Sequence, residues 1–93
     1  MSMKRLEEFE IQNHFKDLQG WKLEGNAIVK EWQFKDFSEA MVFINQVAEL
    51  AEEQDHHPEL FNVYNKVILK FSTHDAGGLT TRDFRIALDI DRL

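Results

Sequence analysis

The sequence of residues 36–54, DFSEAMVFINQVAELAEEQ, predicts a long amphipathic helix in the middle of the chain. Asp36 is a favourable N-cap, and a glutamate lies three residues after it, as in a capping box. The apolar residues then recur with a 3.6-residue period and form one stripe, made by Phe37, Ala40, Met41, Ile44, Val47, Ala48 and Ala51. Phe43 and Leu50 widen the stripe, which favours a well-covered core helix and leaves a subunit contact as the alternative. We therefore expect a helix over residues 37–54.

Two pairs of short strands are predicted, one on each side of this helix. The expected strands cover residues 21–24, 27–34, 61–64 and 67–72. Gly25 and Asn26 tolerate the positive φ angles of a tight hairpin and join the first pair. The last strand alternates apolar and other residues, as a strand with one buried face does, and a turn through Asn65 and Lys66 joins the second pair.

A further helix is expected at each end of the chain. Residues 6–19 carry spaced apolar positions, and Gly20 follows where a left-handed residue stops a helix. Near the other end, Thr80 is a suitable N-cap with Asp83 three residues on, and the buried stripe of this helix is expected to be Phe84, Ala87 and Leu88. Paired strands with short links favour an antiparallel sheet. The predicted fold is α+β, in the order α-β-β-α-β-β-α, with the helices on one face of a four-stranded antiparallel sheet.

Composition narrows the class of protein. Ninety-three residues with 43% hydrophobic content predict one globular domain spanning residues 1–93. The chain contains no cysteine, which excludes disulfide scaffolds and thiolate chemistry. No run of about 18 apolar residues predicts a membrane span, so we expect a cytoplasmic protein. A net charge of -6 argues against direct binding to nucleic acid, because phosphate contacts need a basic surface.

Residues 52–59, EEQDHHPE, contain the strongest signal for chemistry. Three of the four histidines and the only proline fall here and at the nearby His74. Pro58 disfavours α conformation in the residue before it, so the long helix should end ahead of His57 and leave the pair His56 and His57 at a helix-to-strand junction. Histidine exchanges protons near neutral pH, so this cluster among carboxylates suits acid-base catalysis. A solvent-facing polar turn is the alternative for a histidine pair alone.

These residues belong to a longer spaced pattern. The pattern consists of Glu52, His56, His57, Pro58, Tyr64, His74 and Asp83. It resembles the pterin-4a-carbinolamine dehydratase family, and the likeness extends over residues 58–59, 61–67 and 72–80 and to Trp21 and the region around residues 34–37. One departure is Leu60, where many members carry an aromatic residue. If that aromatic helps to wall the pterin pocket, the substrate would pack more loosely here.

The resemblance implies a small enzyme, a 4a-hydroxytetrahydropterin dehydratase, that forms quinonoid dihydropterin. This step recycles the pterin after an aromatic amino acid hydroxylase has used it, which implies a functional link to such a hydroxylase. The pterin is the substrate, so neither a separate cofactor nor a metal is implied. Members of the family assemble as homodimers or homotetramers.

The resemblance also implies the site. Its catalytic residues are expected to be His56, His57 and His74, with His56 and His74 transferring protons and His57 binding substrate and assisting. The expected substrate contacts are Glu52, Asp55, His57 and Asp83.

Two contacts within the site are expected. Glu52 lies four residues before His56, one helical turn away, so it can orient that imidazole or contact the pterin. Asp83 is expected to hold His74 in position, and a simple capping role in the last helix is the alternative.

Two other functions compete with this one. A metal site could use the same histidines and carboxylates, although no His-x-His or His-x-x-x-His spacing occurs. A non-catalytic module for dimerisation, of the transcriptional coactivator type found in the same family, would use helical surfaces instead. The three histidines favour the enzyme, because an interaction module has no need for them.

Overall fold

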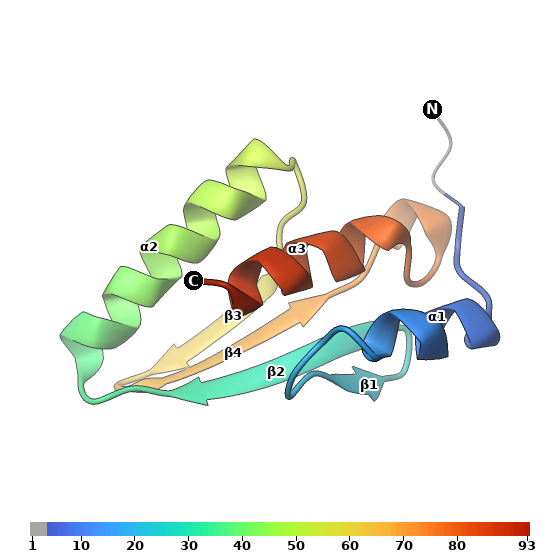
Figure 1. Cartoon of the computed structure of the whole chain (residues 1–93). Coiled ribbons are helices and arrows are strands. Elements are labelled where there is room, and N and C mark those ends of the chain that lie inside the picture. Colours follow the sequence, from blue (N-terminus) through green and yellow to red (C-terminus); the bar gives the residue numbers. More distant parts are fainter. Residues whose placement is uncertain (1–3) are drawn as a thin grey trace.

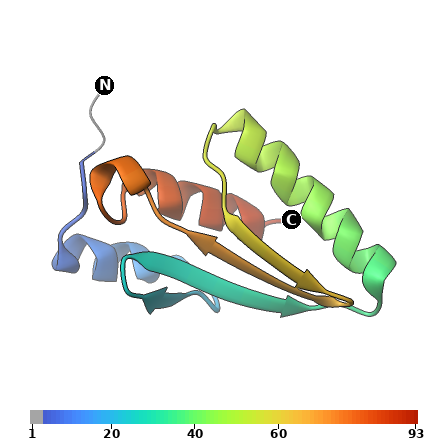
Figure 2. The ribbon, with the colours of Figure 1, turned by 180° about the vertical axis from the view of Figure 1, so that it is seen from behind.

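The computed structural model describes residues 4–93, and it confirms the predicted α+β fold (Figure 1). The elements are, in chain order, α1 (Glu8–Phe15), β1 (Lys22–Glu24), β2 (Ala27–Gln33), α2 (Phe37–Glu53), β3 (Glu59–Val63), β4 (Lys66–Phe71), the short 3-10 helix η1 (His74–Ala76) and α3 (Thr81–Asp91). The two opposite views show the three α-helices on the same side of the sheet (Figures 1 and 2). Within the described residues, no helix combines the length and the apolar character needed to cross a membrane.

The two hairpins join through their second strands. The strand order is β1-β2-β4-β3, and all neighbours are antiparallel. The β2–β4 register runs from Ile28 opposite Phe71 to Gln33 opposite Lys66. The side chains of Ile28, Leu69 and Phe71 face the helices and are fully buried. The residues after Phe71, including His74, form the connection from β4 to the start of α3.

The buried face of α2 differs from the predicted stripe. Its buried residues are Ala40, Phe43, Val47 and Ala51. Phe37, predicted to be buried, is 49% exposed, and Ala48 is also exposed. The helix is rotated so that Phe43 faces inward, because its ring packs against two aromatic rings. The ring centroids lie 4.8 Å from Trp32 in β2 and 5.0 Å from Phe34, the residue after β2.

The last helix buries more than predicted. Phe84 and Ala87 are buried as expected, whereas Leu88 is only half-buried. Ile86 and Ile90 are also buried, because α3 packs against α2 and its apolar side chains join the core that includes Ile28, Leu69 and Phe71 of the sheet. Short apolar stripes in the sequence underestimate a helix that has two packing partners.

The bounds of the first helix and of the second hairpin turn also differ from the prediction. The first helix covers Glu8–Phe15 rather than residues 6–19. The turn of the second hairpin uses Tyr64 and Asn65, not the predicted Asn65 and Lys66. The side-chain amide of Asn62 stabilises this turn by donating to the backbone carbonyl oxygens of Tyr64, at 3.1 Å, and of Lys66, at 2.9 Å.

Asp91 connects the end of α3 to the first hairpin. Its Oδ1 accepts hydrogen bonds from Trp21 Nε1 and from Lys30 Nζ, each at 2.9 Å. We expect Asp91→Ala to lower the free energy of unfolding by about 1–3 kcal/mol, because both donors lose a largely desolvated partner. Urea denaturation measures the effect, and Lys30→Met should cost less because the contact to Trp21 remains. An Asp91→Ala protein as stable as the wild type would contradict this role.

Candidate active site

The helix α2 ends in a hydrogen-bonded reversal that aims the first histidine. Gln54 is the C-cap, and Asp55 adopts a left-handed conformation with φ 49°. The amide of Asp55 donates to the carbonyl of Glu52 at 3.3 Å, and the amide of His56 donates to that of Ala51 at 2.9 Å. This pair of bonds is a Schellman motif, which turns the chain sharply at the end of a helix. His56 is consequently directed back toward the protein interior and is only 8% exposed.

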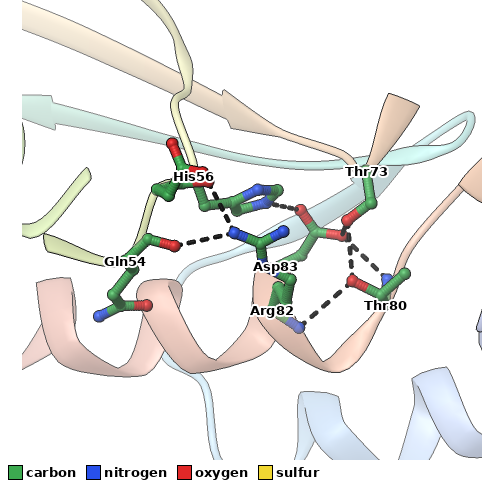
Figure 3. Close-up of polar contacts among 7 residues, drawn as sticks. Gln54, His56, Thr73, Thr80, Arg82 and Asp83 are labelled. Carbon is green, nitrogen blue, oxygen red and sulfur yellow. Dashed lines mark hydrogen bonds and ion pairs between the residues drawn. The ribbon is translucent and has the colours of Figure 1, made fainter. Parts of the chain in front are cut away.

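A buried carboxylate receives the His56 ring (Figure 3). Asp83 Oδ1 lies 2.6 Å from His56 Nε2, and Asp83 itself is fully buried. The second oxygen, Oδ2, accepts from Thr73 Oγ1 and from the Thr80 amide, each at 2.9 Å. One face of the His56 ring stacks on the ring of Phe71, with centroids 5.8 Å apart. These contacts of Asp83 hold the His56 ring in a fixed orientation. A carboxylate can only accept, so an ionised Asp83 requires Nε2 of His56 to be the donor.

The two expected carboxylate-histidine contacts have different partners in the structure. Glu52 Oε2 contacts Nε2 of His57, not His56, and Asp83 contacts His56, not His74. The first prediction was wrong because it extended helical spacing past Glu53, where the Schellman turn already reverses the chain. The predicted contact of Asp83 with His74 was wrong because Asp83 faces the end of α2 and Thr73. The alternative, a capping role in the last helix, is confirmed, since Asp83 Oδ2 accepts from the Thr80 amide.

His74 lines the same hollow as His56 and His57. It begins η1, in a loop closed by mutual backbone hydrogen bonds between Thr73 and Gly78, at 3.0 and 3.4 Å. The hollow has a volume of about 350 Å³. Its lining residues are Asp55, His56, His57, Ser72, Thr73, His74, Asp75 and Arg82. The structure therefore brings the three predicted histidines and Asp55 together.

Two predicted substrate contacts lie outside the lining of the hollow. Glu52 and Asp83 are not among the lining residues of the hollow, and each contacts a histidine that is. Leu60 is likewise absent from the lining, so its smaller side chain does not loosen this hollow. Within residues 4–93, no group of three or more histidine and carboxylate side chains has the geometry of a metal site.

Sequence reasoning missed Arg82, which lines the hollow. Its position carried a signal: it lies in the first turn of α3, where the helix dipole disfavours positive charge. A cation retained at such a place indicates a partner elsewhere. Thr73 was missed as a member of the Asp83 network because its contact depends on how the loop closes. The contact between Thr80 and Asp83 is the predicted capping box.

The left-handed conformation of Asp55 is expected to lower the stability of the protein. A residue with a Cβ is strained at this φ, and glycine is the usual occupant of this position in a Schellman motif. We expect Asp55→Gly to raise the free energy of unfolding by about 0.5–1 kcal/mol relative to Asp55→Ala, which keeps the strain and loses the same carboxylate. Chemical denaturation of both variants measures this difference, and equal stabilities would show that the left-handed conformation is not strained.

Comparison with known proteins identifies the family of the chain. Residues 4–93 match the family model for Pterin 4 alpha carbinolamine dehydratase. Relatives provisionally named pterin-4-alpha-carbinolamine dehydratases include one from Sulfurisphaera tokodaii, 46% identical over 91 residues, and one from Thermomicrobium roseum, 45% identical over 91 residues. In both pairs, 98% of each chain is covered.

A solved structure is also similar. The crystal structure described as a transcriptional coactivator/pterin dehydratase from Brucella melitensis superposes with a TM-score of 0.91 at 41% identity, covering 96% of this chain and 97% of the other. The match of the family model runs through every residue that lines the hollow. The chain belongs to the pterin 4 alpha carbinolamine dehydratase family.

Proposed function

We propose that this protein dehydrates 4a-hydroxytetrahydropterin to quinonoid dihydropterin by histidine acid-base catalysis. The observation that carries the proposal is the convergence of three histidines on one hollow of about 350 Å³, two of them contacting carboxylates. Membership of the dehydratase family supports the reaction class.

The reaction needs little more than this set of side chains. In a carbinolamine, a hydroxyl and a ring nitrogen share one carbon. The carbon–oxygen bond breaks, the leaving hydroxyl takes up a proton, the nitrogen gives up a proton, and a carbon–nitrogen double bond forms. One acid and one base on opposite sides of the reacting carbon supply both transfers, and such catalysis typically contributes roughly 10² to 10⁴ in rate.

The geometry supports a division of roles. Asp83 occupies His56 Nε2, so Nδ1 is the nitrogen of His56 left to accept a proton from substrate. His74 is exposed and lines the same hollow from a separate turn, and it acts as the second proton-transfer group. His57 pairs with Glu52 at the exposed rim and binds substrate, together with the carboxylate of Asp55.

The test is a stopped-flow ultraviolet assay of freshly generated 4a-hydroxytetrahydropterin in metal-free buffer. The wild type should accelerate dehydration, and His56→Ala should lose that acceleration. His14→Ala is the matched control, because His14 stacks on Phe84 away from the hollow and should leave the rate unchanged. A folded wild type that gives no rate above buffer would refute the enzymatic function.

We further propose a cytoplasmic homodimer or homotetramer that serves an aromatic amino acid hydroxylase and does not bind nucleic acid directly. Exposed apolar side chains support self-association: Phe61 and Val63 on the edge strand β3 are 50% and 54% exposed, and Val42 on α2 is 59% exposed. Light scattering of purified protein measures the assembly, and a monomer at micromolar concentration would contradict it.

The Brucella structure favours one second function, since its description includes transcriptional coactivator. A binding role of that kind would use helix and strand surfaces outside the hollow. His74→Ala separates the two, because it should abolish dehydration and leave self-association and partner binding unchanged.

A further inference from the structure

Arg82 reaches from α3 to the end of α2 (Figure 3). Its Nη2 donates to the carbonyl oxygen of Gln54 at 2.8 Å and to that of Asp55 at 2.6 Å. These carbonyls lie at the C-terminal end of α2, whose last turn contains no basic residue. A cation is favoured there by the helix dipole, so the guanidinium contacts the end of α2 that attracts it.

The contact to Asp55 completes the support of one peptide unit. The carbonyl oxygen of the Asp55–His56 peptide accepts from Arg82, and its amide, which belongs to His56, donates to the carbonyl of Ala51 at 2.9 Å. The plane of this peptide is therefore held from both sides. Because Asp55 is in the strained left-handed region, the turn needs such support to persist.

The orientation of two histidines depends on this peptide. His56 and His57 follow it directly, and the ring of His56 must meet Asp83, the neighbour of Arg82 on α3. A rotation of the peptide would swing both rings relative to His74, which stands on a separate loop. Displacements of about 1 Å in a catalytic group can cost on the order of 100-fold in rate.

We propose that Arg82 is a positioning residue that locks the Asp55–His56 peptide and so keeps His56 and His57 aligned with His74 across the hollow. The proposal rests on the proposed dehydratase function for its kinetic consequence. Its structural consequence, a locked turn, can be measured without any substrate.

The structural test is amide hydrogen exchange followed by NMR. In Arg82→Gln, the His56 amide should exchange about tenfold faster than in the wild type, the size expected for losing a charge-assisted hydrogen bond beside it. Arg85→Gln is the matched control, because it makes the same charge change at an exposed position three residues further along α3. Unchanged exchange at His56 in Arg82→Gln would overturn the proposal.

A double variant tests the role of the strained turn. Glycine adopts the left-handed conformation without strain, so Arg82→Gln combined with Asp55→Gly should restore slow exchange at His56. Exchange that stays fast in the double variant would mean that Arg82 supports the end of α2 and not the turn, which would also overturn the proposal.

The kinetic test separates positioning from substrate binding. A positioning role predicts that Arg82→Gln lowers kcat by about 10- to 100-fold with KM changed by less than about threefold, and that Arg82→Lys recovers part of the rate. A raised KM with unchanged kcat and unchanged exchange would assign Arg82 to substrate binding instead. A wild type without dehydratase activity would refute the proposed function, and the exchange results would still decide whether Arg82 locks the turn.

Discussion

His74→Ala is expected to lower kcat by about 10²- to 10⁴-fold, the range for losing one general acid or base. His74 lines the hollow together with His56 and His57 but lies on a separate turn, and the other two histidines already contact carboxylates. Substrate binding should suffer less, because the pair formed by His57 and Glu52 stays in place. The stopped-flow assay gives kcat and KM separately.

The same substitution should leave stability almost unchanged. His74 has an exposed side chain on a short 3-10 turn, and surface changes of this kind are usually within about 0.5 kcal/mol. Urea denaturation of His74→Ala beside the wild type checks this. A folded His74→Ala enzyme that retains the wild-type kcat would exclude His74 from proton transfer.

Asp83→Asn is expected to remove most activity by changing which nitrogen of His56 carries the proton. Asparagine fills the same space but offers one acceptor oxygen where Asp83 serves His56, Thr73 and Thr80. The amide group must then turn its NH₂ toward one of these partners, and His56 can accommodate it by accepting at Nε2. The proton moves to Nδ1, the nitrogen proposed to act as the base, and we expect kcat to fall about 100-fold or more.

The measurement for Asp83→Asn has two parts. Imidazole nitrogen chemical shifts report the tautomer of His56, and the dehydration assay reports the rate. Asp17→Asn is a suitable control, since Asp17 is exposed and its side chain has no hydrogen-bond partner among residues 4–93. An unchanged tautomer together with a wild-type rate would contradict the role of Asp83.

Asp83→Ala tests the same network through stability. It removes the acceptor for two buried donors and for His56, and we expect the free energy of unfolding to fall by roughly 3–5 kcal/mol. For a domain of this size, that loss is a large part of the total stability. Thermal or urea denaturation measures it, and a loss below about 1 kcal/mol would mean that water replaces the carboxylate freely.

Much of the fold could be predicted from local patterns. The side chains of the N-caps Asp36 and Thr80 accept hydrogen bonds from backbone amides of the first helical turn, as expected. The two strand pairs form before and after the long helix in the sequence. The buried face of that helix could not be predicted well, because its rotation depends on the packing of Phe43 against Trp32 and Phe34, which the spacing of apolar residues does not specify.

The sequence by itself determined the order of elements, the family resemblance and the three histidines that line the hollow, because these depend on local period, capping and spacing. Only the tertiary structure decided which carboxylate holds which histidine, and it alone placed Arg82 at the end of α2. The physical reason is that the Schellman turn redirects the chain within two residues. The packing of α3 beside α2 then selects the partners, and neither effect is contained in the spacing of residues along the chain.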